Sequence, residues 1–242
     1  MQEKRIIKIA GEEYTFNIFI ERRNSTRVAI TNHGVNIRIP RHLSAKNREK
    51  EINELIHWAA QRIQDTSIAK QKKKMYKHDD YLKTHSKIYR LQIEIRPSDK
   101  NFSKIQGNYI IFKIADKHNE KARQKYISKQ LQKILAKQHH EELVYHVKRL
   151  NQKYFNKEIN KAYYKYTKSR WGACKTQKKE IDISTKLLLA PLQILEYVII
   201  HELAHLIEPS HSTRFWNIVA SVDPNYKQKK KWLNKNGNDL HL

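Results

Sequence analysis

Cysteine, glycine, proline and acidic residues are all scarce in this sequence. Cys174 is the one cysteine among 242 residues, which excludes an internal disulfide and a cysteine-rich zinc ribbon. The five glycines include no glycine-rich phosphate-binding loop. No stretch approaches the roughly 18 consecutive apolar residues of a membrane span, and Met1–Lys8 lacks the apolar run of a signal peptide. We therefore expect a cytoplasmic protein.

The shortage of acidic residues leaves a large positive charge. The chain has 49 lysines and arginines against 24 aspartates and glutamates, a formal net charge of +25. Such a field attracts nucleic acid, anionic membranes or acidic substrates. Lysines gather in two runs of similar composition, at 70–74 and 227–231. Each run is either a phosphate-binding surface or the solvated face of a helix.

The first half of the chain is rich in strand patterns. Residues 5–39 alternate between apolar and polar side chains with breaks at turn residues, which predicts a small antiparallel meander. A helical pattern follows over 44–77, and strands resume at 88–95 and 109–114. We therefore expect residues 1–115 to form an N-terminal β-rich region with one helix.

A long helix is predicted over residues 119–154 by its stripe of apolar residues. The same segment carries His139, His140 and His146. Their spacing matches no metal-ligand pattern, so we expect them on a solvated helix face.

The most informative stretch is an apolar segment, Leu192–Ile207, that is interrupted by His201, Glu202 and His205. Residues four apart lie on one face of a helix, with Cβ atoms about 5–6 Å apart. The two imidazoles can therefore hold one zinc ion with Glu202 beside them. Because a buried charge is tolerated when it is paired or bound to metal, this HExxH pattern predicts a metal site on a buried helix.

The third ligand is open between two residues. His211 lies ten residues after His201, the spacing of an extended histidine pattern, and Pro209 provides a bend. Asp223 is the alternative, because no glutamate follows Glu208. A catalytic zinc keeps three protein ligands and leaves a fourth position for water, whose pKa falls to about 7.

Strand patterns precede this helix. Residues 159–167 alternate as a half-buried strand, and residues 169–174 and 180–184 then flank a polar turn and predict a β-hairpin. We expect the second strand, 180–184, to present an exposed edge that pairs with an extended peptide. Residues 116–242 would then form a zincin-like metallohydrolase domain.

Several segments together carry a resemblance to a known family. They are Arg170–Cys174, Asp182–Ser184, Tyr197–His205, His211–Ser212, Phe215–Trp216, Pro224–Tyr226 and Trp232–Leu233. Over about residues 155–235 the chain resembles the YgjP-like metallopeptidases, which are related to the SprT-like zincins. With the patterns above, the fold class is α+β: a zincin-like C-terminal part with a buried HExxH helix and a preceding hairpin, plus an N-terminal meander and helix.

The resemblance implies zinc bound by His201, His205 and His211, with Glu202 as general base. On resemblance and chemistry, Arg170 and the hydroxyl of Tyr226 are candidates to stabilise the developing oxyanion. The substrate does not transfer with the motif, since nucleotide hydrolysis has also been proposed within the wider group.

The leading hypothesis is a zinc metallopeptidase that acts on a peptide or protein substrate. One alternative is a zinc-dependent nucleoside triphosphate hydrolase. Another is a basic nucleic-acid-binding protein with an associated peptidase activity. The run Tyr163–Lys168 favours this last alternative, because it interleaves basic residues with aromatic rings that can stack on nucleobases.

Overall fold

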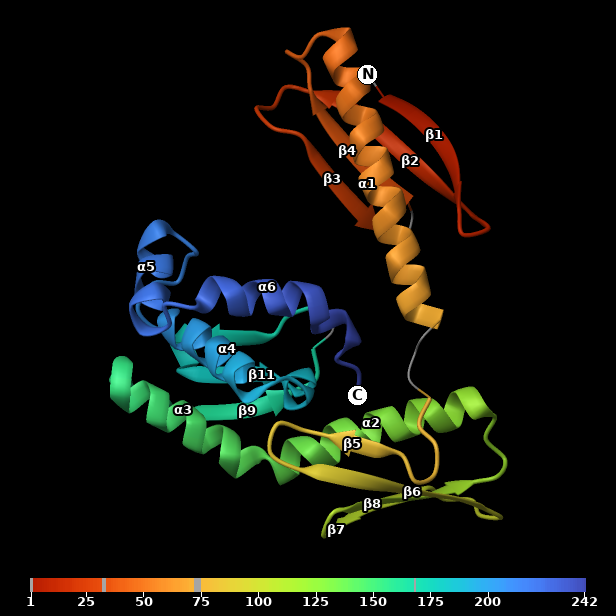
Figure 1. Ribbon diagram of the computed structural model, residues 1–242, viewed down its shortest axis with the longest axis vertical. Helices are drawn as coiled ribbons and strands as arrows, with labels where there is room; N and C mark the ends of the chain where they lie inside the picture. The colour runs from red at the N-terminus through yellow and green to blue at the C-terminus, as the bar shows by residue number, and fades with distance from the viewer. Residues whose placement is uncertain (1, 32–33, 72–74, 168) are drawn as a thin grey trace. The chain divides into compact units, whose positions relative to one another are not determined.

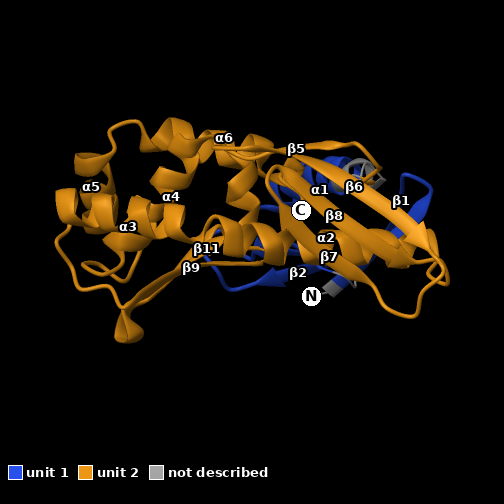
Figure 2. Cartoon of the chain, turned by 90° about the horizontal axis from the view of Figure 1, so that it is seen from below, with its two compact units in different colours: residues 1–73 blue, residues 74–242 orange. Residues whose placement is uncertain are grey.

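Two separate sets of buried apolar residues divide the chain. In this computed structural model, which describes residues 2–31, 34–71, 75–167 and 169–242, one set belongs to Met1–Lys73 and the other to Lys74–Leu242. Figure 2 colours these two compact units, called unit 1 and unit 2 below. Each unit buries its own core.

Unit 1 is a four-stranded sheet covered on one face by a helix (Figure 1). Its elements are β1 (Gln2–Ile9), β2 (Glu12–Glu21), β3 (Arg27–Thr31), β4 (Gly34–Pro40) and α1 (Ala45–Gln71). Alternate residues of the inner strands, such as Phe16 and Ile37, point into the core, where Ile52 and Ala59 of α1 meet them. This period of two on the strands against three to four on the helix is what the sequence pattern predicted.

The strand order corrects the expected meander. The sheet runs β1-β2-β4-β3, so two antiparallel hairpins join through a parallel pairing of β2 with β4. Each tight hairpin was visible in the alternation and turn residues. The parallel join was not, because side-chain alternation looks the same in parallel and antiparallel strands.

Unit 2 holds two sheets and five α-helices among the residues that the structure describes. Its strands are β5 (Tyr81–Lys83), β6 (Ile88–Arg96), β7 (Phe102–Gln106), β8 (Tyr109–Ala115), β9 (Lys161–Lys165), β10 (Gly172–Lys175) and β11 (Glu180–Ser184). Its helices are α2 (Glu120–Gln138), α3 (His140–Tyr154), α4 (Leu192–Ala204), α5 (Thr213–Val222) and α6 (Tyr226–Asn236), with short 3-10 turns η1 (Thr176–Lys178), η2 (Thr185–Leu189) and η3 (Gly237–Asp239).

The first sheet of unit 2 repeats the topology of unit 1. Its order is β5-β6-β8-β7, again two hairpins joined by parallel inner strands and followed by a helix. In the parallel pairings, Phe16 faces Val35 in unit 1 and Leu91 faces Ile110 in unit 2. Both members of the second pair lie 75 positions after their counterparts. The chain therefore contains a structural repeat of four strands and a helix.

The repeat extends into the helices with the same offset. Ser44 accepts a hydrogen bond from the backbone N–H of Asn47 at the start of α1, and Asn119 accepts one from that of Ala122 at the start of α2. Both are N-cap side chains, which satisfy N–H groups that lack partners in the first turn. Most equivalent positions hold different residues, so the sequence alone did not reveal the repeat.

The unit boundary differs from the expected division at 115/116. The sheet β5–β8 belongs to unit 2, because Leu91, Phe112 and Ile114 pack into the same core as α2 and α4. A change from strands to helices along a sequence therefore did not coincide with a change of core. Within the described ranges, no helix is long and apolar enough to cross a membrane.

Because each unit has its own core, a core substitution in unit 1 should lower the stability of unit 1 without changing unit 2. Ile37→Ala should leave a cavity in unit 1 and lower its unfolding free energy by about 2–5 kcal/mol, since Ile37 is wholly buried. Metal content should not change, because the histidines described below belong to unit 2. Urea denaturation followed by circular dichroism, with elemental analysis, tests this. Ile30→Ala, at an exposed position, is the matched control; an equal loss of stability there would contradict the assignment.

Candidate metal centre

The metal-motif helix α4 is placed by local signals at both ends. Pro191 precedes its first turn, where a missing N–H costs nothing. At the other end His205 is the C-cap residue, and the backbone N–H of Glu208 bonds the carbonyl of Ala204. Pro209 follows and prevents the helix from continuing. The chain turns here and leads back towards the helix at His211.

The turn brings three imidazoles together. One nitrogen from each of His201, His205 and His211 lies within 4.8 Å of the other two. The Nε2 atoms of His201 and His211 are 3.0 Å apart. Ring centroids are separated by 5.0 Å for His201–His205 and 4.7 Å for His205–His211. The three residues that the sequence proposed as ligands therefore converge on one point.

Helix α5 supplies an aromatic wall behind the imidazoles. Ser212 caps α5 by accepting from the N–H of Phe215, which fixes the start of the helix. The ring of Phe215 stacks on His205 at 4.5 Å, and Trp216 stacks on His211 at 5.8 Å. These contacts limit rotation of the imidazoles without occupying their nitrogens.

Burial and hydrogen bonding prepare His201 and His205 to bind a metal ion. Burial, with the neighbouring histidines, lowers the pKa of His201 to about 3, so its ring is neutral. Nδ1 of His205 lies 3.2 Å from the carbonyl oxygen of Glu208, and an N–H donated there leaves Nε2 as the free lone pair. Buried Nδ1 of His201 has no hydrogen-bond partner within the described part of the chain. Imidazole nitrogens are common zinc ligands, and this set of three fits the ion.

Glu202 is buried beside the histidines and packed against a glycine. A Cβ added at Gly172 would come within 2.5 Å of Glu202 Oε1, so only glycine leaves room for this carboxylate. Burial raises the pKa of Glu202 to about 8, although the backbone N–H of Cys174 and the charge of Arg170 oppose the shift. The carboxyl group can therefore hold or release a proton near neutral pH.

The strand that carries Gly172 is an edge strand, which corrects one expectation. The second sheet of unit 2 runs β10-β11-β9, with β10 antiparallel and β9 parallel to β11. Residues 180–184 form the central strand, so the predicted edge is wrong for that segment. The edge strands are β10 and β9, and β10 is the one whose residues line the cavity over the metal centre. The predicted hairpin itself, β10 with β11, is present.

A cavity of about 700 Å³ opens over these groups. Arg170, Trp216 and Lys230 are among its lining residues, and the ammonium of Lys230 lies 4.4 Å from the centre of the Trp216 ring. Tyr226 is not one of the described residues that line it. Its ring stacks on Trp216 at 5.4 Å, behind the cavity wall. Arg170 and Tyr226 thus occupy different positions relative to the metal centre.

The alternative ligand, Asp223, is engaged elsewhere. It is buried and accepts a hydrogen bond of 2.8 Å from Lys229, and it is not in the histidine cluster of the described residues. The run 227–231 is therefore divided: Lys229 pairs with Asp223, while Lys230 lines the cavity. The run 70–74 lies outside the residues whose side chains are described.

Sequence reasoning missed the role of Gly172 and the buried thiol. A glycine in a strand signals a close approach by another group, but the approaching residue could not be named from the sequence. Burial and the nearby Glu202 raise the pKa of the Cys174 thiol to about 11, and a raised pKa leaves little of the nucleophilic thiolate at neutral pH. Its backbone N–H, rather than its sulfur, serves the site.

The class of protein that this arrangement points to is a metallohydrolase. The family model described as "YgjP-like, metallopeptidase domain" matches residues 24–236. The chain belongs to this YgjP-like metallopeptidase family, and membership implies a catalytic metal.

Two further proteins are similar to parts of the chain. The "UTP pyrophosphatase" of Escherichia coli (strain K12) is 37% identical over 51 residues, which cover 21% of this chain and 30% of that protein. The crystal structure of the metallopeptidase zymogen of Pyrococcus abyssi abylysin is 21% identical. It covers 38% of this chain and 93% of its own, with a TM-score of 0.36.

The contact at Gly172 predicts a sensitive position. Gly172→Ala should displace the Glu202 carboxylate, and a misplacement of about 1 Å can cost about 10²-fold in rate. The bound metal should be retained, because the added methyl group meets Glu202 and not the imidazoles. Peptide hydrolysis and elemental analysis measure the two effects. Gly107→Ala is the control for backbone strain without a steric contact, because Gly107 has a φ of +57° and an added Cβ there meets nothing within 4 Å; it should keep full activity. Full activity of Gly172→Ala would contradict the contact with Glu202.

Proposed function

We propose that the protein is a zinc-dependent metallopeptidase in which His201, His205 and His211 hold the metal and Glu202 is the general base. The observation that carries this proposal is a buried carboxylate lying beside three converging imidazoles in one open cavity. Zinc held there would polarise a substrate carbonyl oxygen and make water more acidic.

Glu202 supplies the proton transfer in this proposal. Its carboxylate takes a proton from the attacking water and passes it to the leaving amine. The backbone N–H of Cys174 and the close packing on Gly172 hold one orientation of the side chain. The same burial that raises its pKa makes the proton easy to retain until the leaving group needs it.

Arg170 is the better candidate to stabilise developing negative charge. It lines the cavity and its charge acts on Glu202. A guanidinium presents several N–H donors in a fixed plane, which suits an oxyanion. The stacking of Tyr226 on Trp216 favours a supporting role for that ring.

The free edge of β10 suits an extended peptide. Residues from Arg170 to Cys174 line the cavity along this edge. A peptide that adds to an exposed strand gains main-chain hydrogen bonds and presents successive side chains to alternate faces. A substrate bound in this way would run beside the Glu202 carboxylate.

The nucleotide alternative has one observation in its favour. Arg170 and Lys230 place two cations on the wall of the cavity, and the relative with a similar segment has the name UTP pyrophosphatase. Cationic side chains are common partners of transferring phosphoryl groups. We rank it second, because no glycine-rich phosphate loop accompanies these cations.

His211→Ala should remove most of the bound zinc, since it takes away one of three ligands. Asp223→Asn should retain zinc, because Asp223 pairs with Lys229. Elemental analysis of both purified variants measures this, with circular dichroism to show that each is folded. Zinc kept by the first variant and lost by the second would reverse the ligand assignment.

Glu202→Gln should keep the fold and the metal but slow hydrolysis by about 10²–10⁴-fold, since an amide cannot accept the proton. Wild type and variant are compared on casein, a peptide library and UTP. Loss of casein or peptide cleavage supports the peptidase. Turnover of UTP alone, lost in the variant, would establish the nucleotide alternative, and turnover that survives the substitution would exclude Glu202 as the base.

A further inference from the structure

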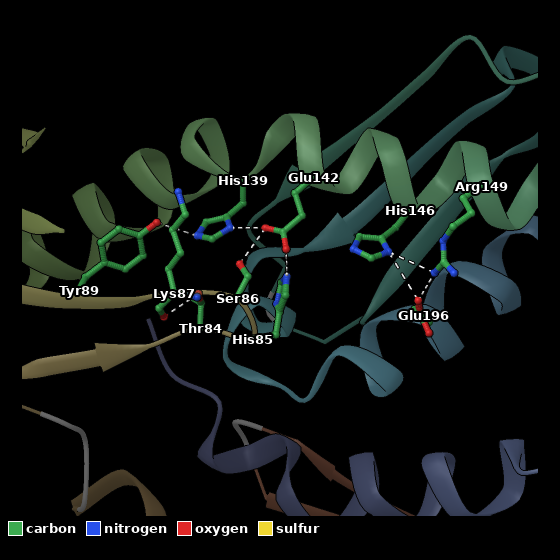
Figure 3. Close-up of polar contacts among 10 residues, drawn as sticks. All are labelled: Thr84, His85, Ser86, Lys87, Tyr89, His139, Glu142, His146, Arg149 and Glu196. Carbon is green, nitrogen blue, oxygen red and sulfur yellow. Dashed lines mark hydrogen bonds and ion pairs between the residues drawn. The ribbon is translucent and has the colours of Figure 1, made fainter. Parts of the chain in front are cut away.

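We propose that His85, His139 and Glu142 form a second divalent-metal site, separate from the HExxH centre, which fastens the β5–β6 turn to the joint between α2 and α3. His85 lies far in sequence from His139 and Glu142, which are one helical turn apart, and the three residues meet in unit 2 (Figure 3). Two imidazoles and one carboxylate are a ligand set that zinc accepts, with water in the fourth position.

The ligand atoms are already gathered around one point. One from each residue lies within 4.8 Å of the other two. Nε2 of His85 is 3.1 Å from one carboxylate oxygen of Glu142, and Nδ1 of His139 is 2.7 Å from the other. Ligands in a tetrahedral zinc site stand about 3.4 Å apart, given bonds of about 2.0–2.1 Å. Small shifts of the side chains therefore suffice to admit an ion.

The cluster is buried, and neighbouring hydroxyl groups contact its ligand side chains, as in a metal site. The side chains of His85 and His139 are 1% and 2% exposed, while that of Glu142 is 28% exposed and leaves a solvent side for water. The hydroxyl of Tyr89 lies 3.0 Å from Nε2 of His139. Metal-bound histidines commonly use their second nitrogen in such a contact. The hydroxyl of Ser86 donates to the Glu142 carboxylate, as is common for ligating carboxylates.

These positions correct the expectation of a solvated histidine face. His139 and His146 are buried, and of the three histidines only His140 is exposed. Further along α3, His146 approaches Glu196, whose carboxylate is also bound by Arg149 (Figure 3). That second pairing offers one imidazole and a carboxylate already neutralised by a guanidinium. The ligand set is complete at His139 and incomplete at His146, about two helical turns further on.

The repeat in unit 1 shows that the fold does not require this cluster. The turn equivalent to His85–Ser86 is Ala10–Gly11, which has no ligand side chain. The helix α1 runs without a break through Gln64, the position equivalent to His139. In unit 2 the helix is interrupted at this point, and His139 separates α2 from α3. The polar cluster is thus an addition to a module that folds without it.

The two turns also differ in how they are stabilised. Ala10 and Gly11 both have positive φ, the conformation that suits a two-residue hairpin turn. Neither His85 nor Ser86 does. Hydrogen bonds between Thr84 and Lys87 close their turn, and tertiary contacts join it to the rest of unit 2. His85 donates its backbone N–H to Leu188, and both turn side chains reach Glu142. An ion bound by His85, His139 and Glu142 would add a further link between this turn and the joint of α2 and α3.

The test uses the full chain with the first site removed. In a His201→Ala/His211→Ala background, the metal-free protein is titrated with Co²⁺ alone and followed by its visible absorption. We expect one equivalent of Co²⁺ bound and a rise in the melting temperature, because a ligand of the native state stabilises it. His139→Gln should abolish both effects. Tyr89→Phe, which keeps the ring, should weaken binding by about 10–100-fold.

Matched variants separate a metal site from a hydrogen-bonded cluster. His140→Gln changes the exposed neighbour and should leave the cobalt spectrum unaltered. Should His139→Gln fail to fold, Glu142→Gln, at a partly exposed position, takes its place. No cobalt uptake by the folded background protein would overturn the proposal. Equal uptake in the His139→Gln and His140→Gln variants would overturn it as well.

Discussion

The burial of one carboxylate is the constraint on which the rest of the site depends. An ionised carboxylate removed from water costs several kcal/mol unless other groups compensate it. Glu202 receives the N–H of Cys174 and the field of Arg170, and it lies beside three imidazoles that can share a cation. Cys174 and Arg170 reach the carboxylate only with the hairpin β10–β11 in one register against α4. In this register, glycine at position 172 is the residue that leaves room for the Glu202 carboxylate.

Features that depend on the local sequence pattern could be predicted. Features that depend on which distant strands pair could not. The apolar run, Pro191 and the four-residue histidine spacing predicted α4, and of the two residues considered as third ligand, His211 is the one that lies with His201 and His205. The order β10-β11-β9 and the shared core of β6, β8 and α4 depend on contacts between distant segments. No periodicity encodes which strand becomes an edge.

The burial of a histidine also depends on segments that are distant in the sequence. A histidine at the end of a helix looks solvated when only its own helix is considered. His139 is buried because the β5–β6 turn and Tyr89 cover it. Lysines behave in a similar way, since one run on α6 serves two purposes, a buried ion pair with Asp223 and a cation on the wall of the cavity. Neighbours in sequence can therefore have unrelated electrostatic roles.

The repeat of four strands and a helix has a consequence for how the chain assembles. Each module pairs strands that are close in sequence, so it can form as soon as its own residues leave the ribosome, with the N-terminal module first. Two modules of one topology in tandem also risk exchanging strands, a known failure of repeat proteins. Their divergence counters this risk, because pairing β2 with β8 would place Asn17, which donates a hydrogen bond to Asn36 in the native sheet, opposite Ile111. Low similarity between the two copies is thus a safeguard against misassembly.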